Sequence, residues 1–103
     1  MNYQIEVIYD GKLRTIAKHL SSNEMILTDA PKDNQGKGQF FSPTDMVATA
    51  LASCMLTIMG ITANNQNINI DGTNAKVKKV MGKNPRKIMD KKWKIVAIHQ
   101  NIL

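Results

Sequence analysis

The sequence is poor in cysteine, histidine and aromatic residues. Its 103 residues include one cysteine, two histidines and 5% aromatic side chains. A single cysteine excludes an internal disulfide framework, and one cysteine with two scattered histidines supplies neither the ligand count nor the close spacing of a zinc site. No metal or other cofactor is therefore expected. The fold has to depend on an apolar core, which the 43% hydrophobic composition of a chain this long can build.

Several familiar signals are also missing. No charged and then apolar leader opens the chain, so a cytoplasmic protein with a reduced Cys54 is expected. There is no Gly-x-Ser-x-Gly elbow, and no Lys-Ser/Thr pair opens a helix as in a phosphate-binding loop. No internal repeat, linker or low-complexity tract divides the chain, which predicts a single domain over residues 1–103.

The positive charge is concentrated late in the chain. The formal net charge is +6, and nine basic residues lie between positions 76 and 94: Lys76, Lys78, Lys79, Lys83, Arg86, Lys87, Lys91, Lys92 and Lys94. Only Trp93 adds an aromatic residue to them, and no nucleic-acid-binding motif is present. A solvated, lysine-rich strand surface is favoured, since lysine also protects exposed strand edges. No nucleic-acid partner is expected.

The most informative stretch runs from Ser42 to Asn64. Ser42 is the expected N-cap, Pro43 occupies the first helical position and Asp45 completes a start that resembles a capping box. No charged residue occurs in the eighteen positions from 46 to 63, so apolar surface surrounds most of the helix, as in a buried helix. That length could span a membrane. Nine of the eighteen are Thr, Ser, Gly or Ala and no aromatic belt flanks them, so no membrane span is expected.

Alternating apolar and polar residues predict strands before the helix. Residues 3–9 alternate, and Asp10-Gly11 is typical of a hairpin turn. A return strand over 12–20, a turn over 21–23 and a short apolar strand over 25–28 follow. The chain is therefore expected to open as a three-stranded antiparallel meander.

A loop is expected between the meander and the helix. Residues 30–41 have no periodicity and concentrate proline, glycine and polar residues. Gly36 and Gly38 would permit a left-handed turn or the close approach of a ligand. Loops of this length are often functional.

Period-two alternation returns after the helix, from Ile68 onward. Gly72 indicates a bulge or bend, residues 82–85 a turn, and residues 86–103 one long final strand with a second bulge around 90–92. The predicted class is α+β: an antiparallel sheet, made of the N-terminal meander and two later strands, packed on one long central helix.

A helix that is apolar all round needs cover on more than one side, whereas one sheet covers only one side. The sequence offers no second helix. A homodimer with the Cys54 helices at or near its interface is therefore predicted.

The role of Cys54 has two interpretations. Free cysteine is among the most buried residue types, so Cys54 is either an inert core residue or a reactive thiol. A reactive thiol needs a nearby cation, and three turns inside a helix the dipole gives no help. Other segments offer Arg14, His19 and His99. Each has a plainer role, because strand arginines often face solvent and histidines are often satisfied, half-buried side chains.

A family resemblance is carried mainly by the helix, where residues 41–55 read Phe-Ser-Pro-Thr-Asp-Met-Val-Ala-Thr-Ala-Leu-Ala-Ser-Cys-Met. This pattern resembles the OsmC/Ohr family, the osmotically inducible and organic-hydroperoxide-resistance proteins. Residues 28–38, Thr-Asp-Ala-Pro-Lys-Asp-Asn-Gln-Gly-Lys-Gly, and Pro85-Arg86 resemble one OsmC-like branch. The resemblance covers essentially the whole chain. It implies an OsmC-like α+β fold, an intertwined homodimer and thiol-dependent reduction of organic peroxides in oxidative stress defence.

Position by position, the resemblance makes Cys54 the peroxidatic cysteine, which peroxide oxidises to a sulfenic acid. Arg14 is the best match to the activating arginine of the peroxidases. Thr44 stands where those peroxidases carry glutamate, and Asp45 is one residue later, turned by about 100° around the helix. Helix capping therefore accounts for Asp45. His19 is expected to assist as a donor or base near neutral pH.

The resemblance also bears on the reductant. Family members usually continue into a further helical segment with a second, resolving cysteine, and this sequence has no second cysteine. Relative to the family, the sequence is therefore expected to be short at its C-terminal end. Either it is a truncated or decayed member, or Cys54 is resolved by an external thiol, from a small molecule or a partner protein.

The residue patterns and the family resemblance together predict a thiol-dependent peroxidase that acts on a small organic hydroperoxide. The expected catalytic residues are Cys54, Arg14 and His19. The expected substrate-binding residues lie on the apolar helix and are Thr44, Ala50, Leu51 and Ile58. Two alternatives stay open: a non-catalytic dimeric module that binds a small apolar ligand, and a basic nucleic-acid-binding domain.

Overall fold

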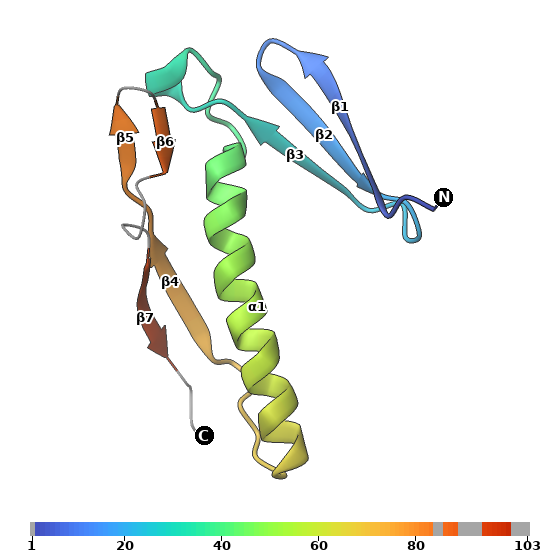
Figure 1. Ribbon diagram of the computed structural model, residues 1–103, viewed down its shortest axis with the longest axis vertical. Coiled ribbons are helices and arrows are strands. Elements are labelled where there is room, and N and C mark those ends of the chain that lie inside the picture. Colours follow the sequence, from blue (N-terminus) through green and yellow to red (C-terminus); the bar gives the residue numbers. More distant parts are fainter. Residues whose placement is uncertain (1, 84–85, 89–93, 100–103) are drawn as a thin grey trace. The chain divides into compact units, whose positions relative to one another are not determined.

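The computed structural model describes residues 2–83, 86–88 and 94–99. It confirms the α+β class, with an N-terminal antiparallel meander followed by one long helix (Figure 1). The elements in chain order are β1 (Ile5–Gly11), β2 (Arg14–His19), β3 (Met25–Asp29), the 3₁₀ turn η1 (Lys32–Asn34), α1 (Pro43–Asn65), β4 (Asn74–Lys78), β5 (Met81–Lys83), β6 (Arg86–Ile88) and β7 (Lys94–His99). The chain forms two compact units, the first ending at Thr44 and the second beginning at Asp45.

The first unit contains the predicted meander, with β2 between β1 and β3. Its first turn is not at Asp10-Gly11, as predicted, but at Lys12 and Leu13, which both have positive φ angles. The turn lies two residues later than predicted because its position decides which residues of β2 share the apolar face of β1. A turn at Asp10-Gly11 would place Lys12 and Arg14 on the apolar face, whereas the observed register pairs Val7 with Ala17.

In the loop between β3 and α1, Gly38 has the predicted left-handed conformation, whereas the close approach at Gly36 is to the backbone and not to a ligand. Gly38 has a φ of +62°, and its amide donates to the Ala30 carbonyl at 3.1 Å. At Gly36, an added Cβ would lie 1.7 Å from that same carbonyl oxygen. The close approach of two backbone segments therefore requires glycine at position 36. The loop also contains the turn η1, which the sequence did not indicate.

The second unit begins with the rest of the predicted helix. α1 starts at Pro43, directly after Ser42, and ends at Asn65, so the expected boundaries are confirmed within two residues. The strand expected from Ile68 begins only at Asn74, because consecutive turns intervene. In these turns the Asn69 side chain accepts a hydrogen bond from the Asp71 amide at 2.7 Å, and Gly72 has a φ of +86°.

The later strands differ from the prediction in number and pairing. Four strands replace the expected two, and in the described residues they form two separate antiparallel pairs, β4 with β7 and β5 with β6. They therefore do not extend the N-terminal sheet as described. Within the expected single strand over 86–103, the described residues form β6, which pairs with β5, and β7, which pairs with β4. The bulge predicted at 90–92 lies outside the described residues.

Candidate functional site

Cys54 is exposed on α1, so the interpretation as a buried core residue is wrong for this chain. Residues four and seven positions away on either side lie within about 40° of Cys54 around the helix. We call this surface the Cys54 side of α1; its residues are Val47, Ala50, Cys54, Ile58 and Ile61. Val47 is 49% exposed, and Ile58 and Ile61 are each 58% exposed. The thiol therefore lies in the middle of an open apolar strip.

The opposite side of α1 is the one that packs. Ala48, Ala52 and Ala63 are the buried residues of the helix, and each is at least about 120° away from Cys54. Asp45 begins the same side, and its Oδ1 lies 2.8 Å from Nζ of Lys79, just after β4. Small alanine side chains allow close approach on this side, which leaves the larger apolar side chains facing outward.

Three of the four predicted substrate-binding residues share the Cys54 side of α1 or border it. Ala50 and Ile58 are exposed there, and Leu51 is half-buried about 60° from Cys54. Thr44, in the first unit, lies with its hydroxyl 3.2 Å from that of Ser42. The substrate-binding roles of these four residues stay predictions.

α1 is also long and apolar enough to cross a membrane, with a mean hydropathy of 1.8 over its most apolar window. This result depends only on length and composition, and the core helix of a soluble protein passes the same test. The absence of a membrane partner stays a prediction.

Arg14, the predicted activating cation, lies at the start of β2 in a group that we call the Arg14 cluster: Arg14, Asp29, Gln39 and Phe40. Its Nε and Nη2 donate to the two carboxylate oxygens of Asp29 at 2.7 and 2.9 Å. Nη2 also donates to the Gln39 side-chain oxygen at 2.7 Å, and the Gln39 amide donates to Asp29 at 3.1 Å. The guanidinium carbon lies 4.8 Å from the centre of the Phe40 ring, a cation–π distance.

The cluster is built around a buried charge. Asp29 is fully buried, and the Arg14 side chain is 18% exposed. The hydrogen bond from Arg14 is the main cause that lowers the pKa of Asp29, helped by the Gln39 amide and by the charges of Arg14 and Lys37. The same hydrogen bond raises the pKa of Arg14. Both groups therefore stay charged, and the positive charge of Arg14 is largely balanced by its partner.

His19 does not join this cluster. It ends β2, five residues from Arg14, which places the two about 16 Å apart along the strand and on opposite faces of the sheet. Its Nδ1 lies 2.6 Å from the Ser22 hydroxyl in the following turn. His99 lies in β7, opposite Asn74. Over the ranges that the structure describes, no three His, Cys, Asp or Glu side chains gather as metal ligands.

Three residues of the Arg14 cluster were not predicted from the sequence: Asp29, Gln39 and Phe40. Asp29 falls one residue beyond the predicted third strand, and the other two lie in the loop before α1. The available signal was a pair of opposite charges at directly opposed positions, since Arg14 and Asp29 pair across β2 and β3. Finding it required the correct register of β2 against β3, which the predicted turn over 21–23 and a third strand ending at residue 28 did not provide.

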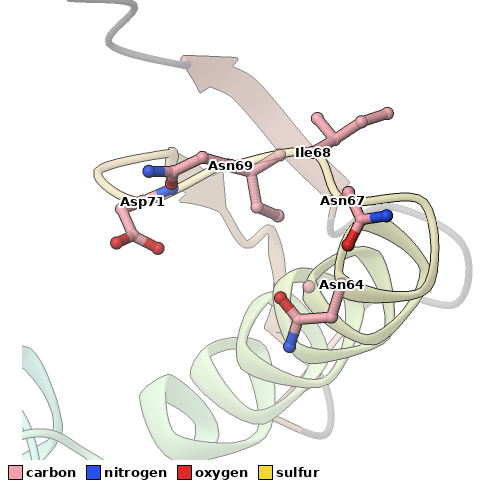
Figure 2. A pocket seen from close by; sticks show the side chains of 7 residues that line it. Asn64, Asn67, Ile68, Asn69 and Asp71 are labelled. Atoms are coloured by element: carbon pink, nitrogen blue, oxygen red, sulfur yellow. The ribbon is translucent and has the colours of Figure 1, made fainter.

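A separate hollow lies at the end of α1, within the second unit. It has a volume of about 580 Å³ and is lined by Gly60, Asn64, Asn67, Ile68, Asn69, Ile70 and Asp71. Figure 2 shows Asn64 on the helix, with Asn67, Asn69 and Asp71 on the segment that follows it. None of the predicted site residues lines this hollow.

No protein-family model matches the chain, and no curated protein matches it. The chain is similar to a solved structure from Psychrobacter arcticus 273-4, of a protein named as an osmotic stress induced and detoxification response protein. The identity is 58% and the TM-score is 0.82. The match covers 85% of this chain and 64% of the other, so this chain spans less than two thirds of that protein's length. The relationship holds in sequence as well as in fold.

Proposed function

From this confirmed resemblance to the OsmC-like proteins, we propose that the chain is a thiol-dependent peroxidase that reduces organic hydroperoxides through Cys54, within a stress and detoxification response. The observation that carries the proposal is the exposed thiol in the centre of an apolar strip. A thiol in that setting is accessible to a substrate whose tail is apolar. The name of the similar protein, with its reference to detoxification, supports the same class of function.

The proposed chemistry is a two-electron oxidation of sulfur. The Cys54 thiolate attacks the outer oxygen of the hydroperoxide, an S–O bond forms and the O–O bond breaks. The leaving alkoxide takes a proton and becomes an alcohol, and Cys54 becomes a sulfenic acid. An external thiol then attacks that sulfur and releases water, and a second thiol cleaves the mixed disulfide to restore Cys54.

The Cys54 side of α1 would hold the organic part of the substrate. Val47, Ile58 and Ile61 together offer exposed apolar surface, which favours an alkyl or aryl hydroperoxide over hydrogen peroxide. Arg14 would donate a hydrogen bond to a peroxide oxygen, a role that suits an arginine held in a fixed orientation. His19 lies about 16 Å from Arg14 along β2 and on the opposite face of the sheet, so the proposed step assigns it no contact with the peroxide group that Arg14 would bind.

The proposal includes a homodimer in the cytoplasm. Large apolar side chains are exposed on α1, and Ile5, Val7 and Tyr9 on one face of the meander are all more than 60% exposed. Exposed apolar surface of this extent is typical of an interface. A second copy of the chain is the proposed cover. The hydroperoxide would then bind at the dimer interface, between the Cys54 side of α1 and the partner subunit. A reducing compartment would keep Cys54 as a thiol.

One observation favours the alternative function, a dimeric module that binds a small apolar ligand without reacting. The charge of Arg14 is already balanced by Asp29, which weakens its ability to stabilise a thiolate. The apolar strip alone would then account for ligand binding.

Turnover separates these functions. Consumption of cumene hydroperoxide by the purified protein, with dithiothreitol as the reductant, is expected to depend on Cys54 and to disappear in Cys54→Ser. Serine keeps the size of the side chain, so the variant is a matched control. A wild-type rate equal to that of Cys54→Ser, with unchanged binding of cumyl alcohol to both, would overturn the peroxidase in favour of the binding module.

A further inference from the structure

We infer that Asp29 is the positioning residue for Arg14, and that together with Gln39 and Phe40 it fixes which edge of the guanidinium is open to a substrate oxygen. The inference rests on the proposed function for what Arg14 does, but its geometric part stands on the contacts of the first unit alone. Asp29 would not touch the substrate. It would act through Arg14.

The guanidinium of Arg14 is held by contacts to three residues. Two parallel hydrogen bonds to one carboxylate fix its plane and its direction. The Phe40 ring contacts it, and the Gln39 oxygen takes the second proton of Nη2. Of the five N–H donors of an arginine, three are therefore engaged, and both protons of Nη1 have no partner in the part of the chain that the structure describes.

Asp29 also holds the loop that completes the cluster. It accepts from the Gln39 amide through its side chain, and its own amide donates to the Phe41 carbonyl at 3.0 Å. Because the carboxylate is fully buried, these bonds do not compete with water. Arg14 and the loop residues that surround it thus share a single anchor.

Two readouts test the inference. The first is exchange of the Arg14 Nε–H with solvent, followed by NMR. We expect it to be at least tenfold slower in the wild type than in Asp29→Asn, which keeps the side-chain shape but removes the charged two-point contact. Asp10→Asn is the matched control: Asp10 affects Arg14 only through its charge, so this variant should leave the exchange rate unchanged.

The second readout is the rate constant of Cys54 oxidation by cumene hydroperoxide. Asp29→Asn should lower it about tenfold or more, because small displacements of a positioned group are costly. The double variant with Arg14→Ala should be no slower than Arg14→Ala alone, since a positioning residue has no effect without the residue it positions. Additive losses would overturn the inference.

The outcomes distinguish this inference from the proposed function. If wild-type Cys54 does not react but Asp29→Asn releases the Arg14 Nε–H, the peroxidase fails and the positioning role stands. If Nε–H exchange is the same in both proteins, the positioning role is wrong whatever the rate. If Asp29→Asn fails to fold, Gln39→Leu is the second variant, because it removes one exposed hydrogen bond to Arg14. We expect Gln39→Leu to speed Nε–H exchange and to slow Cys54 oxidation, each by less than Asp29→Asn would. An unchanged exchange rate and an unchanged oxidation rate would contradict the inference.

Discussion

Lys79 Nζ lies 2.8 Å from Asp45 Oδ1, and this ion pair connects the first turn of α1 with the residue that follows β4. The two side chains are 21% and 43% exposed, so solvent and salt weaken their attraction. Lys79→Met should therefore lower the free energy of unfolding by no more than about 1 kcal/mol, and the loss should shrink in 1 M NaCl. Urea unfolding at low and high salt measures it, with the exposed Lys76→Met as the control. A loss that is independent of salt would show that packing, rather than charge, explains the effect.

The stability of the first unit should fall in acid because of Asp29. Its pKa is lower in the folded chain than in the unfolded chain, chiefly because Arg14 donates hydrogen bonds to it. The stabilisation is therefore fully present above the unfolded value of about 3.9 and is lost as the pH falls through the lower, folded value. Asp29→Asn has no such charge to lose. Urea unfolding between pH 6 and pH 2 should show a smaller acid-dependent decrease for Asp29→Asn than for the wild type; parallel curves would contradict this account.

Gly36 should tolerate no side chain, whereas Gly60 should. A Cβ at position 36 would lie 1.7 Å from the Ala30 carbonyl oxygen, so Gly36→Ala requires the backbone to move. We expect it to lower the free energy of unfolding by about 1–3 kcal/mol.

Gly60 is the matched control for that substitution. It lies inside α1, and apart from its chain neighbours and the nearby backbone of the helix itself, no atom lies within 4 Å of an added Cβ. Gly60→Ala should raise the free energy of unfolding by up to about 1 kcal/mol, because alanine favours the helix. Chemical unfolding of both variants is the measurement. Equal effects at the two positions would contradict the loop geometry.

The sequence was sufficient for α1 because its signals are local. The Ser42-Pro43 start and the uncharged run determine a helix without reference to the rest of the chain. Two local predictions were wrong, the turn at Asp10-Gly11 and the strand beginning at Ile68. The position of the turn depends on which residues share the apolar face of the sheet. The strand begins later because the Asn69 side chain forms a turn with the Asp71 amide. The Arg14–Asp29 pair depends on strand register, so a local pattern could not reveal it.

The proposed homodimer predicts a mass of twice 11.5 kDa in solution. A charge on the Cys54 side of α1 would be buried without a partner in that interface. Ile58→Lys should therefore weaken dimerisation at least tenfold, about 1.4 kcal/mol, whereas Lys76→Glu on β4 should have little effect. Sedimentation equilibrium measures both. A monomeric wild type, or equal effects of the two variants, would contradict an interface at α1.

The central claim is that Cys54 is a reactive thiol selective for organic hydroperoxides. Stopped-flow oxidation of the reduced protein tests it most directly, with cumene hydroperoxide and hydrogen peroxide compared across pH and the sulfenic acid trapped with dimedone for mass spectrometry. The account predicts oxidation confined to Cys54, at least about a hundredfold faster than that of free cysteine with the organic peroxide, and slowed by Arg14→Ala. Oxidation no faster than that of free cysteine, or unchanged by Arg14→Ala, would contradict it.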